Sequence, residues 1–350
     1  MGYTSVRDRT GAVAAAAALV GDSDATNAGL VVDQVMAECG VADRQIAATA
    51  LGQAGGDVAR ACSLVRAWAA VLPRIATSRE QVSSMRATRR ITPGFAGPAG
   101  GQFLGASLDY EQRLLQLGSP LPVWGERNGE GRGRKDGHRP AEAHRAPPAE
   151  FPRALSGLTR EGLIADAHPY AEPIDITREA TDRRTRGALL QLLARGETGA
   201  LTALAYTAIR GFSSRQDPTL AELRRGELGV HMSRPDGGAF MLGEIDITYA
   251  EVVLYRLHGG TPDPRLTLGV GATVGSIERR AIASAVLDAN CARASVGPPH
   301  KLEPAEDTEF LAITLDGQEA AGFVEHLKLP HHVTFTSELD RVRQSQGSGE

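Results

Sequence analysis

Apolar residues recur at helical spacing through most of residues 11–75, and glycine-rich turns interrupt the pattern. This spacing is typical of amphipathic helices that share one core. Asp57 is a good N-cap for the last helix, and Pro73 is expected to end or kink it. The pattern predicts four helices, at residues 11–20, 27–38, 43–53 and 57–75.

Helical spacing returns after residue 155, with helices expected at 187–194 and 197–209. The dipeptide Asp217-Pro218 is typical of a helix start and predicts a short helix that runs to residue 225. Strand-like alternation follows on both sides of the turn sequence Arg-Pro-Asp-Gly-Gly at 234–238. It predicts an antiparallel hairpin of strands 228–232 and 239–247.

A third strand is expected at 266–274, and Ser276 is expected to cap a helix at 277–291. Three shorter elements close the chain: residues 310–315, a helix that ends near His326, and a last helix through 338–343. Runs of helices beside a cluster of strands, without regular alternation, predict the α+β class. We expect a helical N-terminal region followed by a mixed region of helices and antiparallel strands.

Composition divides the chain into three parts. Residues 1–121 form the helical region and include a basic glycine-rich loop, and residues 151–350 form the α+β region with a histidine motif. Between them, residues 122–150 are rich in glycine and charge and poor in apolar side chains. Such a segment cannot bury a core, so we expect a flexible linker.

The net charge of −4 excludes a nucleic-acid-binding field over the whole chain. No run of residues is apolar enough to predict a membrane span. Three cysteines, an odd number without close pairing, argue against a disulfide framework and favour a reducing cytoplasm. Arg7 and Arg9 before residues 12–20 resemble a signal peptide, but the run is mostly alanine and fits a first helix better.

A basic cluster, Arg86, Arg89 and Arg90, precedes the glycine- and proline-rich loop at 93–102. Backbone N–H groups of glycines can approach an anion closely, and arginines can hold a polyphosphate. The loop matches no standard phosphate-binding fingerprint. The competing interpretation is a surface loop flanked by solvated arginines.

Carboxylates occur at two further places. Glu244 and Asp246 lie on the same face of a predicted strand, where they can act as an acid and a base or form a solvated face. Glu278 lies on the first turn of a helix that follows a glycine-rich strand, beside Arg279 and Arg280. A helix start of this kind is another possible anion site.

Three of the nine histidines fall close together, at His326, His331 and His332. Asp316 is expected to cap the preceding helix, and Pro330 is expected to turn the chain so that His326 and His331 approach one point. Two neutral imidazoles suit Zn²⁺, but a zinc site takes three or four protein ligands, so others must come from elsewhere. The competing interpretation is a helix C-cap and surface loop residues.

Longer stretches resemble one known family. The clearest are Ala-Gly-Phe-Val-Glu-His-Leu-Lys-Leu-Pro-His at 321–331, Met-Arg at 85–86 and Arg-Arg-Ile at 89–91. Further matches are Gly100-Gly101-Gln102, Leu104-Gly105, Asp109-Tyr110, Arg113-Leu114-Leu115, Leu204-Ala205-Tyr206, Arg210-Gly211, Gly243-Glu244, Gly275 and Glu278-Arg279. Together they resemble the PhnI subunit of the bacterial carbon–phosphorus lyase core complex, except between about residues 122 and 148.

The resemblance implies a nucleosidase that acts on ATP or GTP and, with partner subunits, displaces adenine from ATP by a phosphonate. The product would be a ribose 1-phosphonate 5-triphosphate, which a radical S-adenosylmethionine subunit then cuts. Two copies of the chain would lie at the centre of the complex. His326 and His331 would bind Zn²⁺ at the interface with the radical subunit, which supplies the missing ligands.

For this chemistry a carboxylate would stabilise the oxocarbenium character at C1′, and donors would hold the triphosphate. The catalytic candidates are Asp109, Tyr110, Glu244 and Glu278. The substrate-binding candidates are Arg86, Arg89, Arg90, Gly100, Gly101, Gln102 and Arg113. Two other functions compete with catalysis: a non-catalytic scaffold that completes a metal site for its partner, and a nucleotide-binding regulator.

Overall fold

The computed structural model describes residues 29–75, 77–78, 80–105, 151–164, 175–177, 185–211, 218–233, 238–258, 261–295 and 301–347. Several expectations lie outside these ranges. They are the helix at 11–20, the linker at 122–150, and the site candidates Asp109, Tyr110 and Arg113. The division into three parts therefore stays a prediction.

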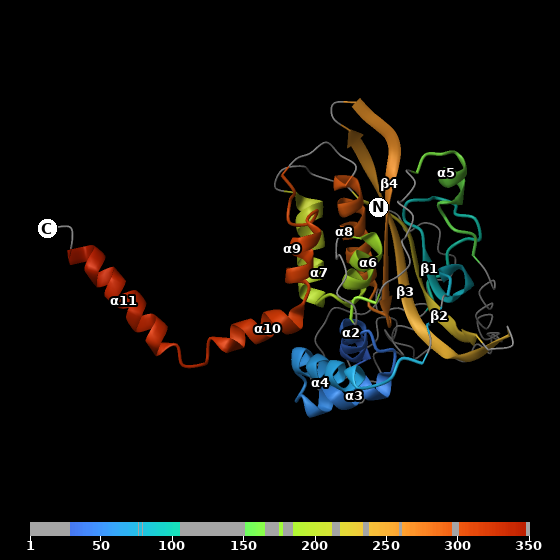
Figure 1. Cartoon of the computed structure of the whole chain (residues 1–350). Coiled ribbons are helices and arrows are strands. Elements are labelled where there is room, and N and C mark those ends of the chain that lie inside the picture. Colours follow the sequence, from blue (N-terminus) through green and yellow to red (C-terminus); the bar gives the residue numbers. More distant parts are fainter. Residues whose placement is uncertain are drawn as a thin grey trace, which may run out of the picture.

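Helices pack against one antiparallel sheet, most of them on one side (Figure 1), and its strands lie in the order β1-β2-β3-β4 within the described residues. This arrangement confirms the α+β class. The strands are β1 (Arg86–Ile91), β2 (Thr219–Ser233), β3 (Ala239–His258) and β4 (Thr261–Val274). The helices are α2 (Gly29–Cys39), α3 (Arg44–Gln53), α4 (Val58–Ala70), η1 (Val82–Ser84), α5 (Ser156–Arg160), α6 (Arg186–Arg195), α7 (Thr198–Arg210), α8 (Glu278–Ala294), α9 (Thr308–Thr314), α10 (Gly317–His326) and α11 (His332–Gly347).

Each face of the sheet packs against a different partner, as strand alternation dictates. On β3, Ala250 and Val252 join the main core, where α6, α7 and α8 cover the sheet. Val253 points to the other face and packs with Leu155 from the segment that leads into α5. Glycines in β4 let α8 come very close: a Cβ at Gly271 would lie 2.6 Å from the backbone nitrogen of Ala285.

Helices α2, α3 and α4 form a second, smaller core at one end of the molecule (Figure 1). Their starts follow local capping chemistry, because the side chains of Asp43 and Asp57 accept hydrogen bonds from the first-turn N–H groups of α3 and α4. The cap at Asp57 confirms the sequence expectation. Helix α4 ends at Ala70, before Pro73.

Buried carboxylates of α2 fix this helical cluster to the main core. Glu38 accepts hydrogen bonds from the backbone N–H and the hydroxyl of Thr198 at 3.0 and 2.7 Å. Asp33 accepts a hydrogen bond from the backbone N–H of Ser276 at 2.9 Å and also pairs with Arg44. These contacts join segments that are distant in the sequence.

Two local expectations are wrong. Residues 219–225 belong to β2 and not to a helix, because they pair on one side with β1 and on the other with β3. Ser276 does not cap α8: Ile277 occupies the N-cap position, and the Ser276 hydroxyl donates to Asp33. The hairpin expectation is confirmed, since Ser233 pairs with Ala239 across the β2–β3 connection.

The C-terminal helices leave the body of the protein. Asp316 caps α10 by accepting hydrogen bonds from Gln318 and Glu319, as the sequence predicts. Helix α10 contacts α4, and α11 then extends away from the rest of the chain (Figure 1). Across the part of the chain that the structure describes, no helix is long and apolar enough to cross a membrane.

Candidate functional site

The basic cluster of the sequence lies on β1, at the edge of the sheet. Strand β1 pairs with β2, with a register shift between Ala87 and Arg89, and the two arginines that follow are both buried. Arg89 and Arg90 are 1% and 0% exposed, whereas the side chain of Arg86 is 59% exposed. The two arginines therefore have to find their partners inside the protein.

Arg90 is surrounded by acceptors. Its Nε lies 2.6 Å from an oxygen of the buried Glu222, and its Nη atoms donate to the carbonyls of Ala99, Gly101 and Pro152 at 2.7–2.9 Å. The guanidinium also stacks over the ring of Phe151 at 4.9 Å. Arg90 thus holds the glycine-rich loop and the segment before α5 against the sheet.

Glu222 also forms an ion pair with a second arginine, Arg224. Its carboxylate accepts from Arg224 Nε at 2.9 Å and from the backbone N–H of Ala154 at 3.1 Å. All three charged side chains are at least 95% buried. Together, Arg90, Glu222 and Arg224 form what we call the buried arginine network.

The glycine-rich loop turns carbonyl groups towards this network. Gly100 and Gly101 adopt φ values of 80° and 75°, a left-handed conformation that favours glycine. The N–H of Gly101 donates to the Pro98 carbonyl, and the Gln102 side chain accepts from the N–H of Thr92. The loop is therefore braced from within.

The two described carboxylate candidates each meet an arginine of β1. Glu278 at the start of α8 lies 2.5 Å from Arg89 Nε, and Arg89 also donates to the Leu104 carbonyl at 2.8 Å. Glu244 on β3 is 44% exposed and lies 3.5 Å from Arg86, which also pairs with Glu227. Triphosphate binding by Arg89 and Arg90 stays a prediction, and an incoming phosphate would have to compete with these carboxylates.

The histidine motif adopts the expected turn. The rings of His326 and His331 meet edge to face with their centroids 5.0 Å apart, on either side of Pro330. His331 Nε2 lies 3.2 Å from the His326 carbonyl oxygen. A carbonyl oxygen can only accept, so a hydrogen bond here requires the proton on Nε2, and in the neutral ring Nδ1 then keeps its lone pair.

Both histidines are solvent-exposed. Among the described residues, no third histidine, cysteine, aspartate or glutamate completes a metal-binding group. Zn²⁺ binding by the pair stays a prediction, and a hydrogen bond from the second ring nitrogen to a carbonyl, as at His331, is common among metal-ligating imidazoles.

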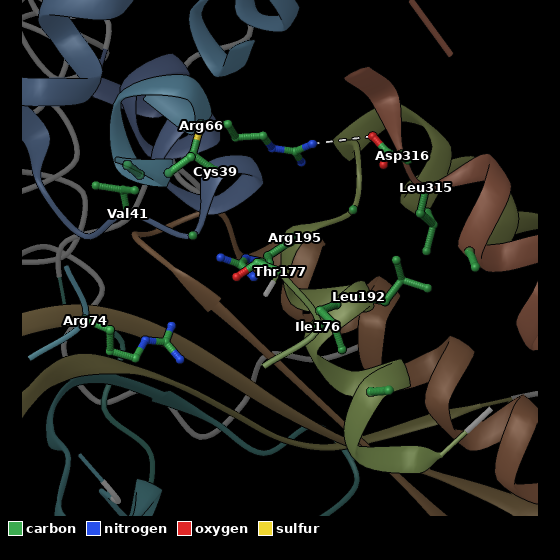
Figure 2. Close-up of a pocket in the computed structure, with 16 residues that line it drawn as sticks. Cys39, Val41, Arg66, Arg74, Ile176, Thr177, Leu192, Arg195, Leu315 and Asp316 are labelled. Atoms are coloured by element: carbon green, nitrogen blue, oxygen red, sulfur yellow. Dashed lines mark hydrogen bonds and ion pairs between the residues drawn. The ribbon is translucent and has the colours of Figure 1, made fainter. Parts of the chain in front are cut away.

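A cavity of about 740 Å³ lies between the N-terminal helices and the main core (Figure 2). The sequence did not point to it. Its cationic lining residues are Arg66 on α4, Arg74 after α4, and Arg195 at the end of α6. No short motif could have revealed it, because the arginines come from three separate segments. The fold alone brings them together.

Comparisons with known proteins agree over nearly the whole chain. A family model described as bacterial phosphonate metabolism protein (PhnI) matches residues 6–348. The chain is 38% identical over 327 residues to the alpha-D-ribose 1-methylphosphonate 5-triphosphate synthase subunit PhnI of Escherichia coli K12, covering 91% of this chain and 88% of that protein.

Two other relatives are similar to a comparable extent. The subunit of the same name from Rhizobium meliloti is 36% identical, over 90% of this chain and 83% of that protein. A putative C-P lyase subunit protein, HtxH, from Stutzerimonas stutzeri is 36% identical, over 91% of this chain and 84% of that protein.

Proposed function

The chain belongs to the PhnI family of bacterial phosphonate metabolism proteins, and on that premise we propose that it is a catalytic subunit of an alpha-D-ribose 1-methylphosphonate 5-triphosphate synthase. The observation that supports this most strongly is the match of one family model to residues 6–348. ATP and a phosphonate are the substrates, and adenine leaves. The cytoplasm is the expected compartment.

The reaction is a substitution at C1′ of the ribose. The bond from C1′ to N9 of adenine breaks, and a phosphonate oxygen forms the new bond to C1′. Adenine leaves with the electron pair and takes up a proton, so the protonated phosphonate or a nearby acid must supply one. Positive charge develops at C1′ in between, and a carboxylate facing the sugar stabilises it.

Among the described candidates, Glu244 is the better placed for this role. Its side chain is 44% exposed on β3 and therefore open to a substrate, whereas Glu278 is 21% exposed and occupied by Arg89. Arg86 is exposed beside Glu244 and can bind a phosphate or phosphonate oxygen. Glu278 then positions Arg89, and Asp109, Tyr110 and Arg113 remain candidates outside the described residues.

The histidine pair serves a different step. His326 and His331 would hold a Zn²⁺ ion together with ligands from a partner subunit, because the described chain offers only two. The family resemblance makes that partner the radical S-adenosylmethionine subunit. The metal would supply Lewis-acid chemistry at this interface, and the chain's own part is to hold the two imidazoles in a fixed relative orientation.

One observation favours the scaffold as a second candidate function. Helices α10 and α11 expose large apolar side chains, including Phe323 at 70%, Val333 at 73% and Phe335 at 60%. Apolar surface of this extent is typical of a subunit interface. A chain that only assembles its partners would need this surface and no catalytic carboxylate.

Adenine release separates the two functions. The complex that contains this chain is incubated with ATP and methylphosphonate, and free adenine is measured by chromatography. We expect Glu244→Gln to reduce adenine release by at least tenfold. The control is Asp246→Asn, which removes a carboxylate from the same face of β3. Unchanged adenine release in Glu244→Gln would exclude this carboxylate, and release without this chain would favour the scaffold.

A further inference from the structure

The cavity in Figure 2 has a positively charged lining that the proposed reaction does not use. Arg66, Arg74 and Arg195 contribute guanidinium groups, and Asp175 and Asp316 are the carboxylates that pair with them. Among the described residues, three guanidinium groups therefore face two paired carboxylates at this cavity.

The three arginines differ in their hydrogen-bond and ion-pair partners. Arg66 lies 3.4 Å from Asp316 and donates to the Glu38 carbonyl at 2.8 Å, and Arg74 forms an ion pair with Asp175. Arg195 has neither a hydrogen bond nor an ion pair with any residue in the described ranges. The N–H groups of its guanidinium are therefore the ones that can donate hydrogen bonds to a ligand.

The Arg195 guanidinium lies against the turn that follows α2. Its guanidinium packs directly on Gly40, which has a φ of 68°, and a Cβ added at Gly40 would lie 2.7 Å from Arg195 Nη2. Only glycine permits both this backbone conformation and this close approach. The guanidinium at the end of α6 thus lies against the backbone of Gly40, and no described residue accepts a hydrogen bond from its N–H groups.

This arrangement is costly without an anion. Partial burial lowers the pKa of Arg195, and Arg66 and Arg74 add to the effect although Asp175 opposes it. Arginine still keeps its proton at neutral pH, so the charge remains. Partial desolvation of this charge is unfavourable, and a bidentate oxyanion would offset it.

Beside the charged side chains and Thr177, the lining contains apolar side chains such as Val41, Ile176, Leu192 and Leu315. The volume of about 740 Å³ falls within the range of cavities that hold small organic ligands. An anionic head with an apolar substituent matches both parts of the wall.

We propose that this cavity binds a small organophosphorus anion, with its oxygens on Arg195 and its organic substituent against Leu192 and Ile176. The choice of a phosphorus oxyanion over a carboxylate rests on the proposed function. The cavity is a site separate from the histidine pair and from the arginines of β1.

The test is calorimetric binding of methylphosphonate, inorganic phosphate and acetate to the full chain. We expect methylphosphonate to bind one to one and more tightly than acetate. Arg195→Gln should weaken binding about ten- to a hundredfold, since a charge-assisted contact is lost. The control is Arg60→Gln, which removes an exposed charge from the same helix as Arg66. Equal binding by Arg195→Gln overturns the site.

A second pair of variants avoids any dependence on how Arg195→Gln folds. Ala69 lines the cavity on α4, where both Glu and Gln are good helix formers. Ala69→Glu should place a competing carboxylate in the cavity and weaken methylphosphonate binding, whereas Ala69→Gln has the same size and should bind more tightly than Ala69→Glu. Equal binding by the two variants contradicts an anion site.

The binding measurement is independent of adenine release. Binding that depends on Arg195, in a complex that releases no adenine, would refute the proposed function and leave the anion site standing. Equal affinity for acetate and methylphosphonate would overturn the phosphorus ligand class. Adenine release without Arg195-dependent binding would overturn the site and leave the proposed function intact.

Discussion

Replacing Glu222 by Gln should destabilise the protein far more than any exposed carboxylate change. Glu222 is 1% exposed and lies between the guanidinium groups of Arg90 and Arg224, with Ala154 N–H as a third donor. Gln has the same shape but no charge, and its amide adds a donor where donors already surround the site. Two buried guanidinium groups would keep only carbonyl partners.

The magnitude follows from the burial of all three groups. Removing one partner of a buried ion pair costs about 3–5 kcal/mol, because an uncompensated charge is left behind. A domain of 150–250 residues melts about 2–4 °C lower per kcal/mol, so the expected decrease in melting temperature is roughly 6–20 °C. Urea unfolding followed by far-ultraviolet circular dichroism gives the free-energy difference, and a thermal scan gives the melting temperature.

Glu227→Gln is the matched control, since it makes the same change on the same strand. The Glu227 side chain is 32% exposed and pairs with the exposed Arg86, so its loss should cost less than about 1 kcal/mol. A free energy of unfolding for Glu222→Gln within 1 kcal/mol of this control would refute the buried arginine network as a source of stability.

Three further results are expected. Gly271→Ala should lower the free energy of unfolding by about 1–3 kcal/mol in urea titrations because its Cβ would meet backbone atoms of α8, whereas Gly243→Ala, with no atom within 4 Å, should not. Burial raises the pKa of Glu251, so the folded protein holds this proton more tightly than the unfolded chain does. From about pH 4 upward, the free energy of unfolding of the parent should therefore fall relative to that of Glu251→Gln as the pH rises. A difference that stays constant with pH would contradict this. In the assembled complex, His326→Ala should remove the bound metal, measured by elemental analysis, and leave adenine release intact. The control, His332→Ala, should keep the metal. A metal retained by His326→Ala refutes the site.

Features that depend on neighbouring residues could be predicted from the sequence. The side chains of Asp57 and Asp316 cap their helices as expected, because a cap involves only the next three residues. The approach of His326 to His331 is of the same kind, since five residues and a proline turn fix it.

Features that depend on distant segments could not be predicted. Residues 219–225 carry a good helix-start signal, but pairing with two neighbouring strands outweighs it. Ser276 is a good N-cap residue by type, yet its hydroxyl donates a hydrogen bond to Asp33, 243 positions away in the sequence. Tertiary partners of this kind leave no trace in the local pattern.

The arginines show why residue type and spacing cannot assign a binding role. Arg90 belongs to the sequence cluster that suggests a phosphate site, yet acceptors within the fold surround it. Arg195 belongs to no motif and lines a cavity where no described residue accepts a hydrogen bond from its side chain. The two should respond to loss of charge in different ways when no ligand is bound. Arg90→Gln breaks buried contacts and should destabilise the fold, while Arg195→Gln removes an unsatisfied charge and should leave the melting temperature unchanged or higher. Added methylphosphonate should then stabilise the parent and not Arg195→Gln. Equal destabilisation by both variants would contradict the distinction between a structural and a ligand-binding arginine.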